Sequence, residues 1–393
     1  MRRSGRHIIM VAALLAGCAF GLASVAAPAR AQDVPHHPAN LSLFYPISTN
    51  QDPTILTYFR FNLMYGRVGY IKGVDIGTIV NRTDRDMRGI QLTGIYSQTG
   101  NDLRGAALTA GINYIGGNAR GIQLAGLVNF DRGNFTGLQS AFLVNFVDRD
   151  FAGVQVTSLF NLNNGDSRYL QLSAAANLTA GSFVGVQLAG FINYTNHRLG
   201  GVQAGVMNIA GEFHGAQIGA FNVAGEASGT QIGIVNWSER IDGVPVGVVN
   251  LTDEGAVSWA TYASNVALAS TGIRTSVRRY ASTFAVGIGD VEQERDDTVF
   301  FSWYYGYMVP LGGGARWWLT PELGYVHVMP QSSEEGKIND LHFMLQAMVK
   351  GEVKLGSITR LFVGGGLSVR FSGYSTAATT ESDPLILAGV SLW

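Results

Sequence analysis

A repeat of fixed length covers residues 71–252 and constrains the fold of this chain more than any other feature. A Gly-x-Gln step recurs every 16 residues and then every 14, in twelve copies. Glycine opens the step in eleven of the twelve copies, and Tyr169 is the exception. Self-similarity at a fixed period indicates one structural unit stacked on itself.

Two polar columns result from the repeat. The third position of the step is occupied by Asp75, Gln91, Ala107, Gln123, Gln139, Gln155, Gln171, Gln187, Gln203, Gln217, Gln231 and Pro245. The copies end at Asn81, Ser97, Asn113, Asn129, Asn145, Asn161, Asn177, Asn193, Asn208, Asn222, Asn236 and Asn250. These columns are the candidate site residues, either as structural ladders of hydrogen bonds or as contacts to a ligand.

Each copy alternates like a strand. In residues 121–130, Ile122, Leu124 and Val128 fall on one face, while Gln123 and Asn129 fall on the other. Two architectures fit this pattern. Each copy is one coil of a β-solenoid whose apolar face forms the core, or it is one strand of a large meander β-barrel with a Gln/Asn-lined lumen.

Three observations favour the solenoid. The connections between copies are uniformly short, whereas outer-membrane barrels alternate short turns with long loops. Consecutive copies carry no insertion. The Gln-to-Asn spacing falls from six to five where the period falls to 14. Losing one residue within a strand would turn Asn to the other face, whereas losing it at a solenoid corner only shortens the coil.

The N-terminal segment predicts export. Residues 1–31 have a basic start, an apolar run and a small-x-small site at Ala29–Ala31, as in a signal peptide. A lipoprotein box ending at Cys18 is the alternative, and the Arg2-Arg3 pair only weakly resembles a twin-arginine signal. Residues 32–40 are predicted to be a leader. Since Cys18 is the only cysteine, cleavage after residue 31 leaves a chain without disulfides or cysteine metal sites.

Composition narrows the class of protein further. The formal net charge is −1 and only 14% of residues are charged, so no basic field points to nucleic acid. An exported, glycine-rich, strand-forming chain without cysteine predicts the outer membrane or cell surface of a Gram-negative bacterium.

The region 253–393 departs from the repeat and predicts a C-terminal antiparallel outer-membrane β-barrel. Seven strand-like runs occur at about 257–272, 274–288, 297–310, 315–329, 339–354, 357–372 and 384–393. Each is long enough to cross a bilayer as a tilted strand, which takes roughly 9–11 residues. Bacterial barrels favour even strand numbers. An eighth strand is therefore expected from Leu41–Tyr45 or Ile55–Tyr65, in the N-terminal strand region 41–70.

The repeats carry a family resemblance. The strings GIQLAGLVN (121–129), GVQLAGFIN (185–193), GAQIGAFN (215–222) and GTQIGIVN (229–236) resemble the bacterial surface-repeat proteins of the kind found in Leptospira. The resemblance covers about residues 41–252. It implies a cell-surface location and no catalytic residues. A weaker similarity, in the 14-residue period alone, is to the β-roll heads of trimeric adhesins.

Motifs for catalysis are absent from the sequence. It contains no Gly-x-Ser-x-Gly elbow, phosphate loop or His-Glu-x-x-His. His327 and Glu322 are the only candidates for a membrane-embedded hydrolase. We therefore expect a non-enzymatic scaffold or binding surface without cofactor or metal. Outer-membrane lipid is the expected partner, with a surface glycan or a protein as candidate ligand. A porin-like channel is the alternative function, and the sequence does not indicate the oligomeric state.

Overall fold

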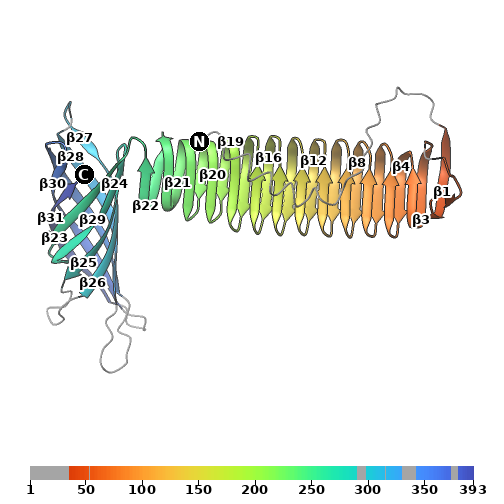
Figure 1. Cartoon of the computed structure of the whole chain (residues 1–393). Helices are drawn as coiled ribbons and strands as arrows, with labels where there is room; N and C mark the ends of the chain where they lie inside the picture. The colour runs from red at the N-terminus through yellow and green to blue at the C-terminus, as the bar shows by residue number, and fades with distance from the viewer. Residues whose placement is uncertain (1–34, 53, 290–297, 315, 330–341, 373–378) are drawn as a thin grey trace. The chain divides into compact units, whose positions relative to one another are not determined.

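A computed structural model describes residues 35–52, 54–289, 298–314, 316–329, 342–372 and 379–393. The predicted signal peptide lies outside the described residues. The chain divides into two compact units, residues 1–198 and 199–393. A parallel β-solenoid of about 14 turns covers residues 36–252, and an eight-stranded antiparallel β-barrel follows (Figure 1). The predicted all-β fold is confirmed, and the alternative of one large meander barrel is wrong because the repeats pair in parallel.

Each 16-residue coil contains one long and one short strand. The long strands are β4 (Tyr70–Gly77), β6 (Met87–Thr93), β8 (Leu103–Thr109), β10 (Ala119–Ala125), β12 (Phe135–Ala141), β14 (Phe151–Thr157), β16 (Ser167–Ser173) and β18 (Phe183–Ala189). The short strands are β5 (Val80–Thr83), β7 (Tyr96–Thr99), β9 (Ile112–Ile115), β11 (Val128–Asp131), β13 (Val144–Val147), β15 (Phe160–Asn163) and β17 (Ala176–Thr179). Equivalent positions of successive coils are paired, as in Gln123 with Gln139 and Asn129 with Asn145.

The change of period keeps both columns inside the coil. In the later coils the strands merge into β19 (Ile192–Ala204), β20 (Met207–Ile218), β21 (Phe221–Ile241) and β22 (Val244–Thr252). Gln217 pairs with Gln231 and Asn208 with Asn222, 14 residues apart, and all four stay buried. Residues are therefore lost at the corners of the coil, as the sequence predicts.

The inside and outside of the coil are reversed from the expectation. The expected core residues Ile122 and Leu124 are 43% and 36% exposed, whereas Gln123 and Asn129 have no exposed surface. The interior also holds a largely apolar column near the start of the long strands, including Met87, Leu103, Phe135, Phe151 and Phe183 and interrupted by Ser167. The prediction that Ile122, Leu124 and their equivalents form the core is therefore wrong. In that part of the coil the interior consists of the hydrogen-bonded amides of the Gln and Asn columns.

The glycine of the repeat step allows the coils to stack closely. Gly137 has φ +136°, and a Cβ atom there would lie 1.9 Å from the carbonyl oxygen of Gly121 in the preceding coil. Only glycine fits this close approach without strain. Tyr169, the exception in the column, adopts φ +90° with an exposed side chain.

The N-terminal strands belong to the solenoid. β1 (His36–Phe44) and β3 (Leu56–Val68) pair in parallel, β2 (Ile47–Ser48) pairs with β1, and β3 pairs in parallel with β4 and β5. The proposed eighth barrel strand, Leu41–Tyr45 or Ile55–Tyr65, is therefore wrong. Residues from His36 onward, placed by the sequence in a leader, already form a strand.

The barrel obtains all eight strands from residues 256–392. They are β23 (Ala256–Ser264), β24 (Ala269–Val277), β25 (Tyr280–Gly289), β26 (Thr298–Tyr307), β28 (Trp317–Val328), β29 (His342–Leu355), β30 (Thr359–Ser372) and β31 (Thr379–Leu392). A short strand, β27 (Val309–Leu311), pairs with β28. β31 pairs with β23 and closes the barrel. The single run predicted at 257–272 is two strands separated by a tight turn. In this turn Ser264 Oγ accepts hydrogen bonds from the backbone N–H groups of Val266 and Ala267.

No helix within the described ranges is both long and apolar enough to cross a membrane.

Candidate functional site

The Gln column forms a buried ladder of amides. Gln139 Nε2 donates to Gln123 Oε1 at 2.9 Å, and Gln155 Nε2 donates to Gln139 Oε1 at 2.8 Å. The same bond recurs from Gln171, Gln187, Gln217 and Gln231 to the preceding coil. Ala107 interrupts the column. Gln91, Gln203 and the other glutamines of the column are buried inside the coil. Their amides bond to one another and to neighbouring side chains of the interior, and they do not reach the solenoid surface.

The Asn column donates in the opposite direction. Asn129 Nδ2 donates to Asn145 Oδ1 in the following coil at 2.9 Å, and the same nitrogen donates to the carbonyl oxygen of Ser140 at 2.7 Å. Asn193 accepts from Asn177, and Asn222 links Asn208 to Asn236. Both hydrogens of these amides are therefore used, which offsets the cost of burying them.

Breaking the Asn ladder should destabilise the solenoid strongly. Asn145→Ala leaves the amide of Asn129 and the side-chain oxygen of Asn161 without this partner in a buried site. We expect the free energy of unfolding to fall by about 2–3 kcal/mol, measured by denaturant titration with far-UV circular dichroism. Asn164→Ala, which removes an exposed contact to Asp148, is the control and should change stability by less than about 0.5 kcal/mol. Equal effects would contradict a buried ladder.

Among the described residues, Asp75 and Asp131 are buried inside the solenoid. Asp75 ends the Gln column, where it accepts from Gln91 and pairs with buried Arg60 at 2.5 Å. Asp131 accepts from Gln123 and Gln139. Burial raises the pKa of Asp131 to about 8, and the Gln123 hydrogen bond only partly opposes this.

Asp131 should make the solenoid less stable as the pH rises. Because its pKa is higher folded than unfolded, the folded chain binds more protons between about pH 4 and pH 8, and the free energy of unfolding falls across that window. Asp131→Asn recreates the native pairing of Asn163 with Gln155. Its stability advantage over the native chain should grow from pH 5 to pH 8.5 in thermal unfolding. Exposed Asp150→Asn should show no such growth; an equal advantage at both pH values would contradict a proton held at Asp131.

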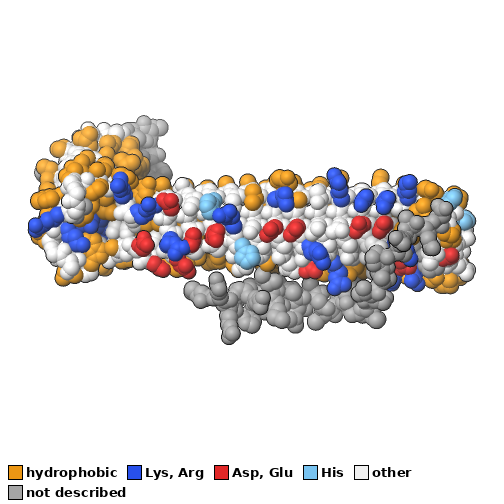
Figure 2. Space-filling model, turned by 90° about the horizontal axis from the view of Figure 1, so that it is seen from above, with side chains coloured by type: hydrophobic (Ala, Val, Ile, Leu, Met, Phe, Trp, Pro, Cys, Tyr) orange, Lys and Arg blue, Asp and Glu red, His pale blue; other side chains and the backbone are white. Residues whose placement is uncertain are grey.

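The outer surface of each coil has two chemically distinct parts. Between residues 87 and 252, the charged side chains lie in one region of each coil, and buried Asp131 is the exception. This region is the turn after the short strand together with the start of the next long strand. We call this the charged edge, as represented by Arg120 and Arg132. The rest of the outer surface, represented by Ile122, Leu124, Leu127, Val128 and Phe130, carries no charge, and we call it the uncharged face. Figure 2 shows charged side chains in rows along the solenoid.

Large apolar side chains are exposed throughout the uncharged face. They are Ile90, Leu92, Ile95, Ile122, Leu124, Leu127, Leu138, Phe142, Leu159, Phe160, Leu188, Phe191 and Ile192 in the first unit and Val206, Ile218, Phe221, Ile232 and Ile234 in the second. Soluble proteins rarely expose contiguous apolar patches beyond a few hundred Å². The face is therefore a candidate interaction surface. The alternation within each strand does not reveal this face, whereas the position of the charges around the whole coil does.

Side chains fill the barrel interior. Glu352 accepts from Arg274 at 2.6 Å and from Arg360 at 3.1 Å, and Lys350 pairs with Glu322 at 2.6 Å. The other part of the interior is an apolar cluster comprising Tyr262, Ala267, Ala285, Phe300, Tyr304, Val326, Val328, Met344, Met348, Phe362, Leu385 and Leu387. An eight-stranded barrel is just wide enough for side chains to fill.

No family model, curated protein or solved structure matches this chain. The solenoid and the barrel are therefore interpreted from their own geometry.

The hydrolase candidates do not form a site. Glu322 points into the barrel and pairs with Lys350, whereas His327 lies five residues on along β28, on the outer side of the wall beside Tyr325. An odd spacing along a strand places two side chains on opposite faces.

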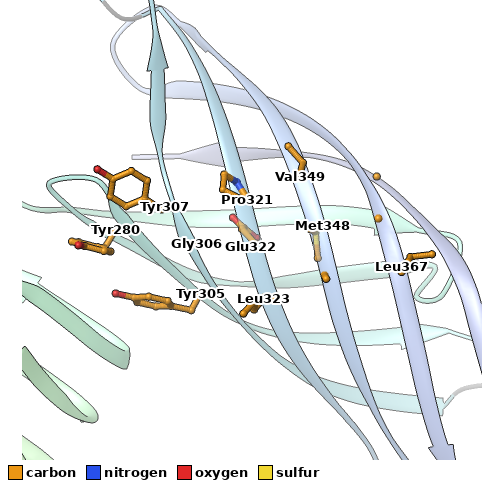
Figure 3. A pocket seen from close by; sticks show the side chains of 13 residues that line it. Tyr280, Tyr305, Gly306, Tyr307, Pro321, Glu322, Leu323, Met348, Val349 and Leu367 are labelled. Atoms are coloured by element: carbon orange, nitrogen blue, oxygen red, sulfur yellow. The ribbon is translucent and has the colours of Figure 1, made fainter. Parts of the chain in front are cut away.

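The outer wall of the barrel carries an apolar groove of about 570 Å³. Tyr280, Tyr305 and Tyr307 border it on one side, with Leu323 and Leu367 across from them (Figure 3). Gly306, Gly365 and Gly366 lack side chains that would fill it. A second apolar groove, of about 720 Å³, lies on the uncharged face of the early coils. Its lining includes Leu92, Gly94, Leu108, Ala110 and Gly126.

Proposed function

We propose that this protein is a non-enzymatic outer-membrane scaffold, in which the barrel is the membrane anchor and the solenoid is the working surface. One observation carries the proposal: a closed barrel has an apolar outer wall around an interior filled by charged and aromatic side chains. Outward-pointing residues include Val257, Trp259, Ile273, Phe284, Val286, Ile288, Leu319, Leu323, Leu345, Val349, Leu361, Val363 and Ile386. Such a wall suits hydrocarbon, and closure leaves no strand edge unpaired in lipid.

The aromatic residues support the same assignment. Tyr280, Tyr305, Tyr307 and Trp317 lie on the outer wall near the turns at residues 278–279 and 312–314. Tyrosine and tryptophan are enriched where a barrel wall meets the polar headgroups. The resemblance of the repeats to Leptospira-type surface-repeat proteins, and the predicted signal peptide, favour the same envelope location.

The turns favour a periplasmic rather than a surface-exposed solenoid. The turn at 278–279 joins β24 to β25 and the turn at 356–358 joins β29 to β30, and both are short. In outer-membrane barrels the short turns face the periplasm. Within the unit 199–393, the last coil meets the barrel beside a short turn: Arg278 donates to the carbonyl oxygen of Ile241 at 3.3 Å and pairs with Asp242.

Reconstitution tests the anchor against the channel alternative. The full chain, refolded into phosphatidylethanolamine/phosphatidylglycerol vesicles, should float with the lipid in a density gradient and should produce no conductance steps in planar bilayers. A protein that stays out of the lipid fraction would contradict the anchor. Regular conductance steps would favour the channel. Larger steps in the Lys350→Ala variant would then show that the ions pass through the barrel interior.

A further inference from the structure

We propose that the uncharged face of the solenoid lies among the acyl chains of the phospholipid leaflet on the periplasmic side of the outer membrane. The solenoid would then be partly embedded in the membrane rather than standing free of it. This inference rests on the proposed function, because it requires the barrel to be in the membrane.

The backbone amides of the uncharged face are hydrogen-bonded within the solenoid, as a hydrocarbon environment requires. At the turn between the long and short strands, Gly126 N donates to Thr109 O at 2.9 Å, and Leu127 N and Val128 N both donate to Gly111 O. The flanking strands pair with the coils on either side. An unpaired peptide group costs several kcal/mol in lipid. Turns whose amides bond to the preceding coil avoid that cost.

The shape of the face favours a fluid partner over a second protein copy. It continues from Leu124 on one strand, around the turn at Leu127, to Val128 and Phe130 on the other strand. A flat partner would cover one side of such a convex surface and leave the others exposed, whereas acyl chains can surround it. The side chains at the turn also differ from coil to coil, as in Gly126, Phe142 and Ser158. That irregularity suits lipid, which adapts to it, better than a regular protein interface.

The charge distribution matches a membrane boundary. The charged edge carries both signs, including Asp148, Arg149 and Asp150 in one turn. Charges at hydrocarbon depth are expensive, and an amphipathic element lying in a membrane keeps its charges toward headgroups and water. The separation holds in the coils of each unit taken by itself, since Glu212, Glu226 and Arg240 also lie on the return side of their coils.

In the second unit the two apolar surfaces are continuous. Tyr305 Oη donates to Pro245 O of the last coil at 2.8 Å, and Ser282 Oγ donates to Gly247 O at 2.6 Å. Both barrel residues lie on the outer wall, and Tyr305 also borders the barrel groove. The last coil thus packs directly on the wall that the proposed function assigns to lipid.

Spin labels read by two relaxation agents test this inference. Single cysteines in a Cys18→Ser chain would replace Phe142 and Ile234 on the uncharged face, and Arg149 and Arg240 on the charged edge. Leu323, 71% exposed on the barrel wall, provides the membrane reference. The labelled full chain is reconstituted in phosphatidylethanolamine/phosphatidylglycerol vesicles, and relaxation by oxygen is compared with relaxation by a water-soluble nickel chelate.

The expected result is an oxygen-to-nickel accessibility ratio at positions 142 and 234 close to that at 323 and several-fold above that at 149 and 240. High nickel accessibility at 142 and 234, with 323 still in lipid, would overturn the inference and leave the anchor intact. Shielding of 142 and 234 from both agents would also overturn it, and would indicate a second copy or another protein. Water contact at 323 would remove the proposed function together with the inference.

Discussion

Replacing Glu352 by glutamine should lower the free energy of unfolding of the barrel by about 3–5 kcal/mol, the largest effect expected for any single substitution in this protein. The carboxylate lies between the guanidinium groups of Arg274 and Arg360, at 2.6 and 3.1 Å, and all three side chains are at least nine-tenths buried. Glutamine is nearly the same size, so packing is preserved. Two cations would then lie in the interior without their shared anion.

Denaturant titration of the reconstituted chain, followed by tryptophan fluorescence, measures this effect. Glu381→Gln, on the exposed part of β31, is the matched control and should lie within about 0.5 kcal/mol of the native protein. Adding Arg274→Met to Glu352→Gln should recover part of the loss, because it removes one of the two buried cations that lost the Glu352 carboxylate. A loss below about 1 kcal/mol for Glu352→Gln would contradict a dry, closed interior.

The second large effect is expected at the glycine of the repeat step. Gly137→Ala forces a Cβ atom toward the carbonyl oxygen of Gly121 at a φ that L-residues rarely adopt. The coils can relieve the contact only by moving apart, which weakens the bonds on both sides. We expect the free energy of unfolding of the solenoid to fall by about 3 kcal/mol, measured by far-UV circular dichroism in denaturant.

The same column offers a substitution of opposite sign. Tyr169→Gly removes the strain of a tyrosine at φ +90°, and its side chain is 63% exposed, so little packing is lost. A net gain of about 1 kcal/mol is expected after the greater flexibility of glycine in the unfolded chain is subtracted. Destabilisation by both substitutions would contradict the assigned backbone geometry.

The sequence was sufficient to predict the stacking but not the orientation of the faces. The fixed period and the loss of one residue between Gln217 and Asn222 favoured a solenoid over a meander barrel, since a residue lost at a corner does not turn a strand over. Alternation separates Ile122 from Gln123 but does not say which points inward. The usual rule places apolar residues inside. It fails here because identical amides in register satisfy one another across coils, a property of the stack rather than of one copy.

Two further errors have local causes. The run 257–272 contains a turn without glycine or proline, and Ser264 and Asn265 alone are a weak turn signal. The segments 41–45 and 55–65 lack the repeat motif and therefore look different from the coils they begin. The spacing of the charged residues in the sequence already separates charged from uncharged positions of each repeat. The structure adds which of the uncharged positions lie on the outside of the coil.

Neutron reflectometry on the full chain in a supported phosphatidylethanolamine/phosphatidylglycerol bilayer tests the central claim most directly, because it locates protein mass along the membrane normal. An anchored barrel with a lipid-contacting solenoid predicts protein density across the whole bilayer, with the additional density of the solenoid overlapping one leaflet and its headgroups and no separate layer beyond them. A distinct, water-rich protein layer standing off the membrane would show that the solenoid projects from it, and would contradict the claim.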